Sequence, residues 1–233
     1  WSPLHAKTGT VGAATPGIEV KLAEDGEVLC RGAGVFSGYF KDVEKTAEAL
    51  DADGWLHTGD IGQLDSDGYL RIVDRKKELI ITAGGKNVSP ANLEAFLKGL
   101  PLVGQACAIG DDKPFISALI ALDPEKLKPW AVRRGLRDLT LTQAAKHPDV
   151  IAEIEAALPH AMASFNHAER VKRVSILDSE WLPDSDELTP TSKLKRRVIH
   201  KKYATEIEAL YATTLVPPAH VAAESDAAKR SAG

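Results

Sequence analysis

The chain has 233 residues, of which 44% are hydrophobic and 27% charged, a globular composition sufficient for one large or two modest domains. The formal net charge of −4 provides no general attraction to nucleic acid or to anionic lipid. Cys30 and Cys107 match no metal or redox spacing, which favours a reducing cytoplasm. No apolar run approaches the roughly 20 residues that cross a bilayer.

The first 40 residues or so are expected to form β structure. Ile18, Val20 and Leu22 alternate with charged residues between two turn sequences, Pro-Gly before them and Glu-Asp-Gly after them. The segment 27–31 follows as the next strand.

A short connection follows these strands. Gly32, Gly34 and Gly38 lack the Gly-x-Gly-x-x-Gly spacing, so they predict turns between strands rather than a dinucleotide site. Asp42 is a good cap for a short helix over residues 43–50.

Two further strands are predicted at 55–61 and 69–73, joined by a hairpin turn at 65–68. Asp60 follows a Thr-Gly pair at a strand end, where its carboxylate can accept two hydrogen bonds from a vicinal diol. Arg75 can lay a planar, permanently charged group against the same sugar or its phosphate. Taken alone, the position of Asp60 favours a turn aspartate that caps local backbone amides.

From Arg75 onward the pattern changes to alternating helices and strands, which places a boundary between two units at about residues 73–77. Ser89-Pro90 is a typical helix start, and near-continuous apolar runs rich in β-branched residues indicate buried strands. The expected strands are 79–81, 103–109, 115–122 and 170–177. Helices are expected from residue 90 onward, over 124–134, within 139–165 and over 193–211. Within 139–165, Pro148 would start one helix and Pro159 would end or kink it.

Three polar segments of the second unit have alternative interpretations. The charged run 74–80 is either a solvated bend or a hinge at the composition switch. The glycine-rich segment 82–87 is not a Walker A motif, because it lacks the earlier glycine and the following Ser/Thr, and is either a tight turn or a place of close backbone approach by a ligand. The basic run 193–202 is a solvated helix end or a nucleic-acid patch, and the lack of interleaved aromatic residues disfavours nucleic acid.

These segments together resemble a known enzyme family. The runs Asp-Gly-Trp-Leu-His-Thr-Gly-Asp-Ile-Gly (53–62), Asp-Arg-Lys-Lys-Glu-Leu-Ile (74–80), Gly-Gly-Lys-Asn-Val-Ser-Pro (84–90) and Leu-Thr-Pro-Thr-Ser-Lys-Leu-Lys-Arg-Arg (188–197) are similar to motifs of the AMP-forming adenylating enzymes. Within that superfamily the chain looks most like the long-chain fatty acyl-CoA synthetases, and the resemblance extends to about residue 215.

The resemblance implies an α+β fold. Residues 1–73 would form a small β-barrel-like subdomain that closes the larger N-terminal domain, and residues 74–77 a hinge. Residues 78–215 would form a small, mobile α/β C-terminal domain. Residues 216–233, rich in Ala, Ser, Lys and Glu, are expected to be disordered. Because the chain opens on Trp-Ser-Pro without a start methionine, we expect it to be a piece of a longer protein.

The resemblance also implies a role for residues around the hinge. Asp60 and Arg75 would bind the ribose of ATP and of the acyl-adenylate. Lys77 would be the pivot of the domain rotation, and Asp74 matches the aspartate that long-chain synthetases often carry in this linker. Metal binding is assigned to no residue of this chain, because the glutamate that holds Mg²⁺ belongs to the family's N-terminal domain.

Two further segments receive roles in the same way. Gly84 and Gly85 would lie beside the pantetheine channel for CoA. Many relatives have a lysine where this chain has Ile81, so any phosphate contact from that position would be either lost or supplied by Lys86. Lys193 would be the catalytic lysine that reaches the carboxylate and the α-phosphate during adenylation, whereas its neighbours 195 and 196 are expected to tolerate alanine.

The function implied is that of a long-chain fatty acid–CoA ligase, which converts a fatty acid, ATP and CoA into acyl-CoA, AMP and pyrophosphate through an acyl-adenylate. The chain alone would be inactive, because its partner, the N-terminal domain with the phosphate loop and the fatty-acid tunnel, is not in this sequence. Two alternatives stay open: an adenylating enzyme that passes the acyl group to a carrier protein, and a non-catalytic binding module. The expected location is the cytoplasm, with a peripheral membrane association of the parent left open.

Overall fold

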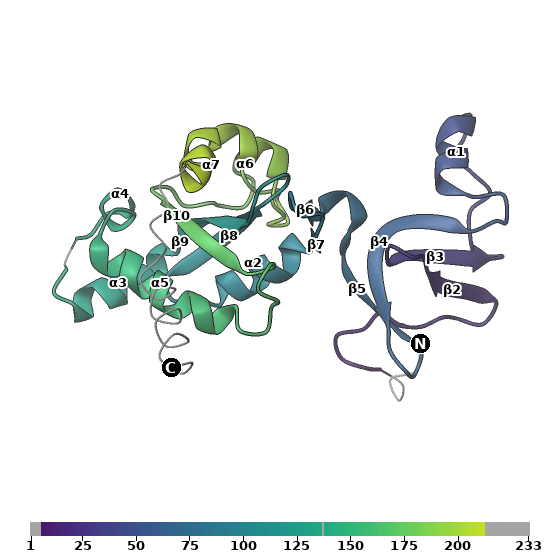
Figure 1. Ribbon diagram of the computed structural model, residues 1–233, viewed down its shortest axis with the longest axis horizontal. Helices are drawn as coiled ribbons and strands as arrows, with labels where there is room; N and C mark the ends of the chain where they lie inside the picture. Colours follow the sequence, from purple (N-terminus) through teal and green to yellow (C-terminus); the bar gives the residue numbers. More distant parts are fainter. Residues whose placement is uncertain (1–5, 137, 213–233) are drawn as a thin grey trace, which may run out of the picture.

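The computed structural model describes residues 6–136 and 138–212, which form two units joined by a short linker (Figure 1). We call residues 6–75 the strand unit and residues 79–212 the α/β unit. The linker is the 3₁₀-helix η2 (Lys76–Glu78). The expected disordered tail, 216–233, lies outside the described residues.

The strand unit is built on a five-stranded antiparallel sheet with the order β1-β5-β4-β3-β2. Its strands are β1 (Gly12–Ala13), β2 (Ile18–Leu22), β3 (Glu27–Gly32), β4 (Leu56–Leu64) and β5 (Tyr69–Arg75). The expected hairpins are confirmed, and the turn between β4 and β5 is closed by hydrogen bonds from the backbone N–H groups of Asp67 and Tyr69 to the Asp65 carboxylate.

The expected β-barrel is wrong for the described residues, because this sheet is open. A barrel requires its two edge strands to pair with each other. Here the edges are β1 and β2, and β1 is only two residues long. The helix α1 (Val43–Ala49) is capped by Asp42 as expected, but none of its residues is buried.

The α/β unit begins with a small hairpin of β6 (Ile80–Ile81) and β7 (Asn87–Val88), which leads into α2 (Pro90–Lys98). Its main sheet has the order β10-β9-β8, in which β8 (Val103–Ile109) is antiparallel and β10 (Val171–Leu177) parallel to the central β9 (Ile116–Leu122). The remaining helices are α3 (Pro124–Arg133), α4 (Leu141–Ala144), α5 (Pro148–Ala161), α6 (Arg196–Lys202) and α7 (Ala204–Tyr211).

The central strand β9 is buried along its whole length, because helices cover both faces of the sheet (Figure 1). Ile116, Ala118 and Ile120 belong to a core that includes residues of α2, α3 and α5. Leu119 and Ala121, which point the other way, pack in a second core with α6 and α7. This two-sided burial explains why β9 reads as a continuous apolar run in the sequence.

The expected single helix over 193–211 is wrong: the structure has two helices that meet at Tyr203, and the first begins only at Arg196. Tyr203 is buried, and its hydroxyl donates to Glu187 and accepts from Trp181 Nε1 at 2.8 Å and 3.1 Å. Fixing this side chain at the junction favours a bend between the two helices. At Pro159, by contrast, helix α5 continues for two more residues, to Ala161.

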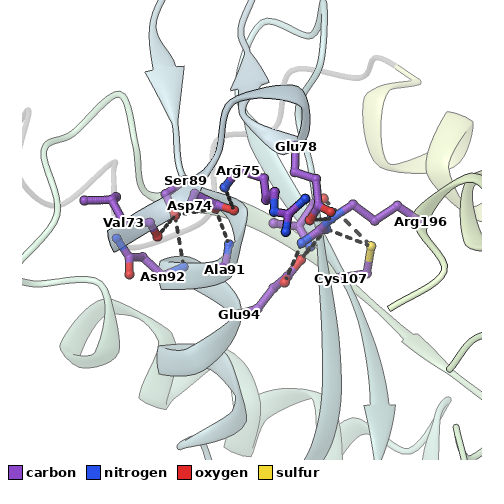
Figure 2. Close-up of polar contacts among 11 residues, drawn as sticks. Val73, Asp74, Arg75, Glu78, Ser89, Ala91, Asn92, Glu94, Cys107 and Arg196 are labelled. Carbon is purple, nitrogen blue, oxygen red and sulfur yellow. Dashed lines mark hydrogen bonds and ion pairs between the residues drawn. The ribbon is translucent and has the colours of Figure 1, made fainter. Parts of the chain in front are cut away.

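A buried ion pair ties α6 to α2 (Figure 2). Arg196 donates two hydrogen bonds to Glu94, at 2.7 Å and 2.8 Å, and Glu94 also accepts the backbone N–H of Ala108. The Arg196 guanidinium also contacts Cys107 Sγ at 3.8 Å and Glu78 in the linker at 3.5 Å. This buried pair argues against the expectation that residue 196 tolerates alanine. Sequence patterning gave no sign of the buried partner.

We expect Arg196→Ala to lower the free energy of unfolding of the α/β unit by about 3 kcal/mol, because it leaves the Glu94 carboxylate buried without its charged partner. Urea denaturation monitored by circular dichroism measures this. The matched control is Arg197→Ala, which removes an exposed neighbour and should change the free energy by less than about 0.5 kcal/mol. Equal effects of the two variants would contradict the importance of the pair.

Candidate functional site

Asp60 and Arg75 lie directly opposite each other on adjacent strands, in β4 and β5. Arg75 Nε is 3.1 Å from Asp60 Oδ1, and the Arg75 side chain is 72% exposed while that of Asp60 is 32% exposed. The structure therefore brings these two predicted residues together at an accessible point. A carboxylate beside a guanidinium can accept hydrogen bonds from a diol and attract an anion at the same place.

Glu27, which no motif of the sequence indicated, is a buried carboxylate that fixes the backbone of the residues just before Asp60. Its two oxygens lie 2.9 Å from the backbone N of Gly59 and 3.1 Å from His57 Nδ1. Gly59 has φ +71°, a conformation that favours glycine. A charged residue at the start of an apolar strand is the only signal of this role in the sequence.

Glu27 also holds the start of the linker. Lys76 Nζ donates to Glu27 at 2.9 Å and contacts Asp25 at 2.6 Å. Burial opposes ionisation of Glu27, but the hydrogen bonds from Lys76, His57 and Gly59 outweigh it and lower the pKa of this carboxyl. The same carboxylates raise the pKa of Lys76, so both groups are charged at neutral pH.

The predicted pivot, Lys77, is the middle residue of η2 and lines a cavity of about 620 Å³ between the linker and α6. Leu194 and Lys195 line the other side of the same cavity. The cavity therefore connects the linker with the segment that carries Lys193, although Lys193 itself is not among its lining residues.

The predicted CoA-side residues form the turn between β6 and β7. Gly85 has φ +75° and its N–H donates to the carbonyl of Thr82, while Gly84 precedes it in the same turn. Space around Gly85 is open, so the backbone conformation and not crowding requires glycine there. Lys86 Nζ lies 3.3 Å from Glu169, so in this structure its charge is directed to a carboxylate of the α/β unit.

Lys193 lies in a tight loop before α6, not on a helix. Its backbone N–H donates to the Thr189 hydroxyl at 3.0 Å, and its carbonyl accepts the Thr189 N–H at 2.9 Å. The following Lys195 is anchored, because its Nζ donates to the carbonyl of Ser185 at 2.8 Å. The loop backbone is thus fixed on both sides of Lys193, while its side chain is exposed.

The described residues do not bring all predicted positions into one site. Hydrogen bonds and ion pairs within these residues join Asp60 to Arg75, but they join neither of the two to Lys193 or to the Gly84–Gly85 turn. In the same part of the chain, no group of His, Cys, Asp or Glu is arranged to hold a metal ion, and no helix is long and apolar enough to span a membrane.

Comparison with known proteins shows which family the chain is similar to. Residues 77–215 match the family model described as "AMP-binding enzyme C-terminal domain". The putative fatty-acid–CoA ligase fadD11 of Mycobacterium tuberculosis is 52% identical over 92% of this chain and 38% of its own length. FadD15, a long-chain fatty-acid–CoA ligase of the same species, is 48% identical over 88% and 34% of the two lengths. Human ACSBG1, also a long-chain fatty-acid–CoA ligase, is 37% identical over 90% and 32%.

Solved structures show the same fold. The adenylation domain of a carboxylic acid reductase from Segniliparus rugosus, in complex with AMP and a carboxylic acid, has a TM-score of 0.68 at 22% identity and covers 89% of this chain and 34% of that one. The ATP-bound chimera RpMatB-BxBclM B1 has a TM-score of 0.60 at 26% identity, over 84% and 36% of the two lengths. The chain spans about a third of the length of each of these relatives. It belongs to the superfamily of AMP-forming adenylating enzymes and corresponds to the C-terminal region of their fatty-acid–CoA ligases.

Proposed function

We propose that this chain is the C-terminal part of a long-chain fatty acid–CoA ligase. The observation that carries this proposal is its similarity to fatty-acid–CoA ligases across both units, at 52% identity to one of them. The full-length parent would convert a fatty acid, ATP and CoA into acyl-CoA, AMP and pyrophosphate. We propose the boundaries 1–73, 74–77 and 78–215 for its last subdomain, its hinge and its C-terminal domain.

In this proposal the residues of the chain act at different steps. Asp60 accepts hydrogen bonds from the ribose hydroxyls, and Arg75, 3.1 Å from it, adds a charged donor beside the nucleotide. Lys193 places a mobile positive charge on the substrate carboxylate and the α-phosphate as negative charge develops there. Mg²⁺ would be held outside this chain and would neutralise charge on the phosphates.

The second step requires a different surface. After rotation about Lys77, the Gly84–Gly85 turn would offer its backbone to the pantetheine arm of CoA, and Lys86 would be available for a phosphate contact. The CoA thiol attacks the acyl carbonyl carbon, its proton is lost, and AMP leaves with the electrons of the acyl–phosphate bond. The two steps thus use two different segments of one mobile unit.

The parent protein, incubated with a long-chain fatty acid, ATP and Mg²⁺, should release pyrophosphate and form acyl-CoA only when CoA is added. Mass spectrometry of the acyl products measures this. If the acyl-adenylate forms but only a carrier protein accepts the acyl group, the CoA ligase assignment is wrong and the adenylation chemistry stands. If no adenylate forms with any carboxylic acid, the chain is a non-catalytic module.

Asp60→Ala in the parent should raise the KM for ATP at least tenfold, because the ribose hydroxyls lose a charged acceptor worth about 1.5–3 kcal/mol for each hydrogen bond. Steady-state kinetics with ATP as the varied substrate measures the change. Asp67→Ala removes an exposed carboxylate from the neighbouring turn and should leave KM unchanged. An unchanged KM and normal turnover for Asp60→Ala would remove the ribose assignment.

Lys77→Pro should affect the two half-reactions unequally, because proline fixes φ near −65° and removes a backbone donor at the proposed pivot. Single-turnover assays of adenylation and of thioester formation from pre-formed acyl-adenylate measure the two rates. Lys77→Ala is the control for loss of the side chain. Equal losses in both half-reactions that match the alanine control would argue against a hinge at this residue.

Lys193→Ala should slow acyl-adenylate formation by roughly 10²–10³, the scale for deleting one preorganised electrostatic contact. It should leave thioester formation from pre-formed acyl-adenylate nearly normal. The control is Lys201→Ala, an exposed lysine of α6, because Lys195 has a structural hydrogen bond to Ser185. If Lys193→Ala slows both half-reactions alike, the catalytic lysine is placed wrongly.

A further inference from the structure

Asp74 makes a contact across the linker that the proposed roles above do not use (Figure 2). Its backbone belongs to the strand unit, where it pairs with Ile61 in the sheet. Its carboxylate, however, accepts hydrogen bonds from the Ser89 hydroxyl at 2.6 Å and from the backbone N–H of Ala91 at 3.1 Å. Asp74 is only 8% exposed, so this carboxylate is enclosed by the groups it joins.

The contact completes the N-terminus of α2. The first N–H groups of a helix have no partner within the helix, and they favour negative charge. Proline at position 90 has no N–H, Ala91 donates to Asp74, and Asn92 donates to Ser89 Oγ. The first turn of α2 is therefore satisfied jointly by its own cap and by a carboxylate from the other unit.

Few other hydrogen bonds join the strand unit to the α/β unit among the described residues. Within residues 6–136 and 138–212, the hydrogen bonds that join the strand unit to the α/β unit all include Asp74 or Ser89; the third is the weak contact from Ser89 Oγ to the carbonyl of Val73 at 3.5 Å. The η2 linker lies between the two partners in the chain. Rotation of one unit about η2 would change the separation of Asp74 and Ser89 and break bonds of this length.

We propose that Asp74 and Ser89 form a latch that holds the α/β unit in one orientation and must open for it to adopt the other. Both are positioning residues: they contact each other across the linker and set which half-reaction the parent is ready to perform. Because water can replace the partners of both groups once they separate, the latch biases the equilibrium between orientations without blocking it. This inference rests on the proposed rotation about the linker.

The linker offers a direct readout, because Arg75, Lys76 and Lys77 are three consecutive trypsin sites. In the full-length parent, Asp74→Ala should accelerate cleavage after these residues about tenfold, as measured by the new peptide ends in mass spectrometry. It should also shift the ratio of the two single-turnover half-reaction rates at least fivefold. Asp67→Ala, an equally charged change in the turn before β5, should alter neither quantity.

Asp74→Asn is the second variant, because it keeps the size and one acceptor oxygen while removing the charge. It should give a smaller change in the same direction, with an unchanged urea midpoint that excludes general unfolding. Unchanged cleavage and an unchanged rate ratio in both variants would overturn the latch. Faster cleavage with equal losses in both half-reactions would also overturn it, since the contact would then only cap α2. If the parent lacks adenylation activity altogether, the proposed function fails, and the cleavage rates alone decide whether Asp74 holds the linker.

Discussion

The geometry of the candidate site depends on one buried carboxylate, that of Glu27. It accepts one hydrogen bond from the backbone N–H of Gly59, in the Thr-Gly-Asp segment, and another from the ammonium group of Lys76. A buried charge is costly unless it is fully paired, so moving any of these donors away would leave the Glu27 carboxylate buried without a partner. That cost holds the donors in place. The position of Asp60 and the start of the linker are thus set by a single group that has no proposed contact with any substrate.

The second unit is organised differently, since its rigidity comes from a sheet with helices on both faces. The Arg196–Glu94 pair lies where α2, β8 and the start of α6 meet, and its guanidinium also reaches the linker through Glu78. Lys193 is three residues before Arg196. The loop that presents the proposed catalytic lysine is therefore anchored to the interior of the unit, while the lysine side chain is exposed.

Much of this fold follows from local patterns in the sequence. The hairpin at Asp65–Gly68, the cap at Asp42 and the Ser89-Pro90 helix start all have chemistry that acts over a few residues, and all are confirmed. Two features were not predictable in this way. Whether the strand sheet closes depends on pairing of its distant edges, and the break at Tyr203 depends on partners 16 to 24 residues away.

In the candidate site, too, some residues could be predicted from the sequence and others could not. Motif resemblance selected Asp60 and Arg75, and the register of β4 and β5 places them together. The residues that hold them, such as Glu27, resemble ordinary charged residues until their partners are known. Motifs thus identify residues that act on ligands, whereas residues that act only on the protein become visible through three-dimensional contacts.

Cys107, which lies beside the Arg196–Glu94 pair, gives the α/β unit an internal reporter. It is fully buried, and burial together with the Glu94 charge raises its pKa to about 12. The thiolate is the reactive form of cysteine, so this thiol is chemically silent at neutral pH while the core beneath α6 and α7 is intact. Alkylation of Cys107 therefore requires that core to open. Under native conditions, the alkylation rate reports how often the core beneath α6 and α7, which supports the loop of Lys193, opens locally.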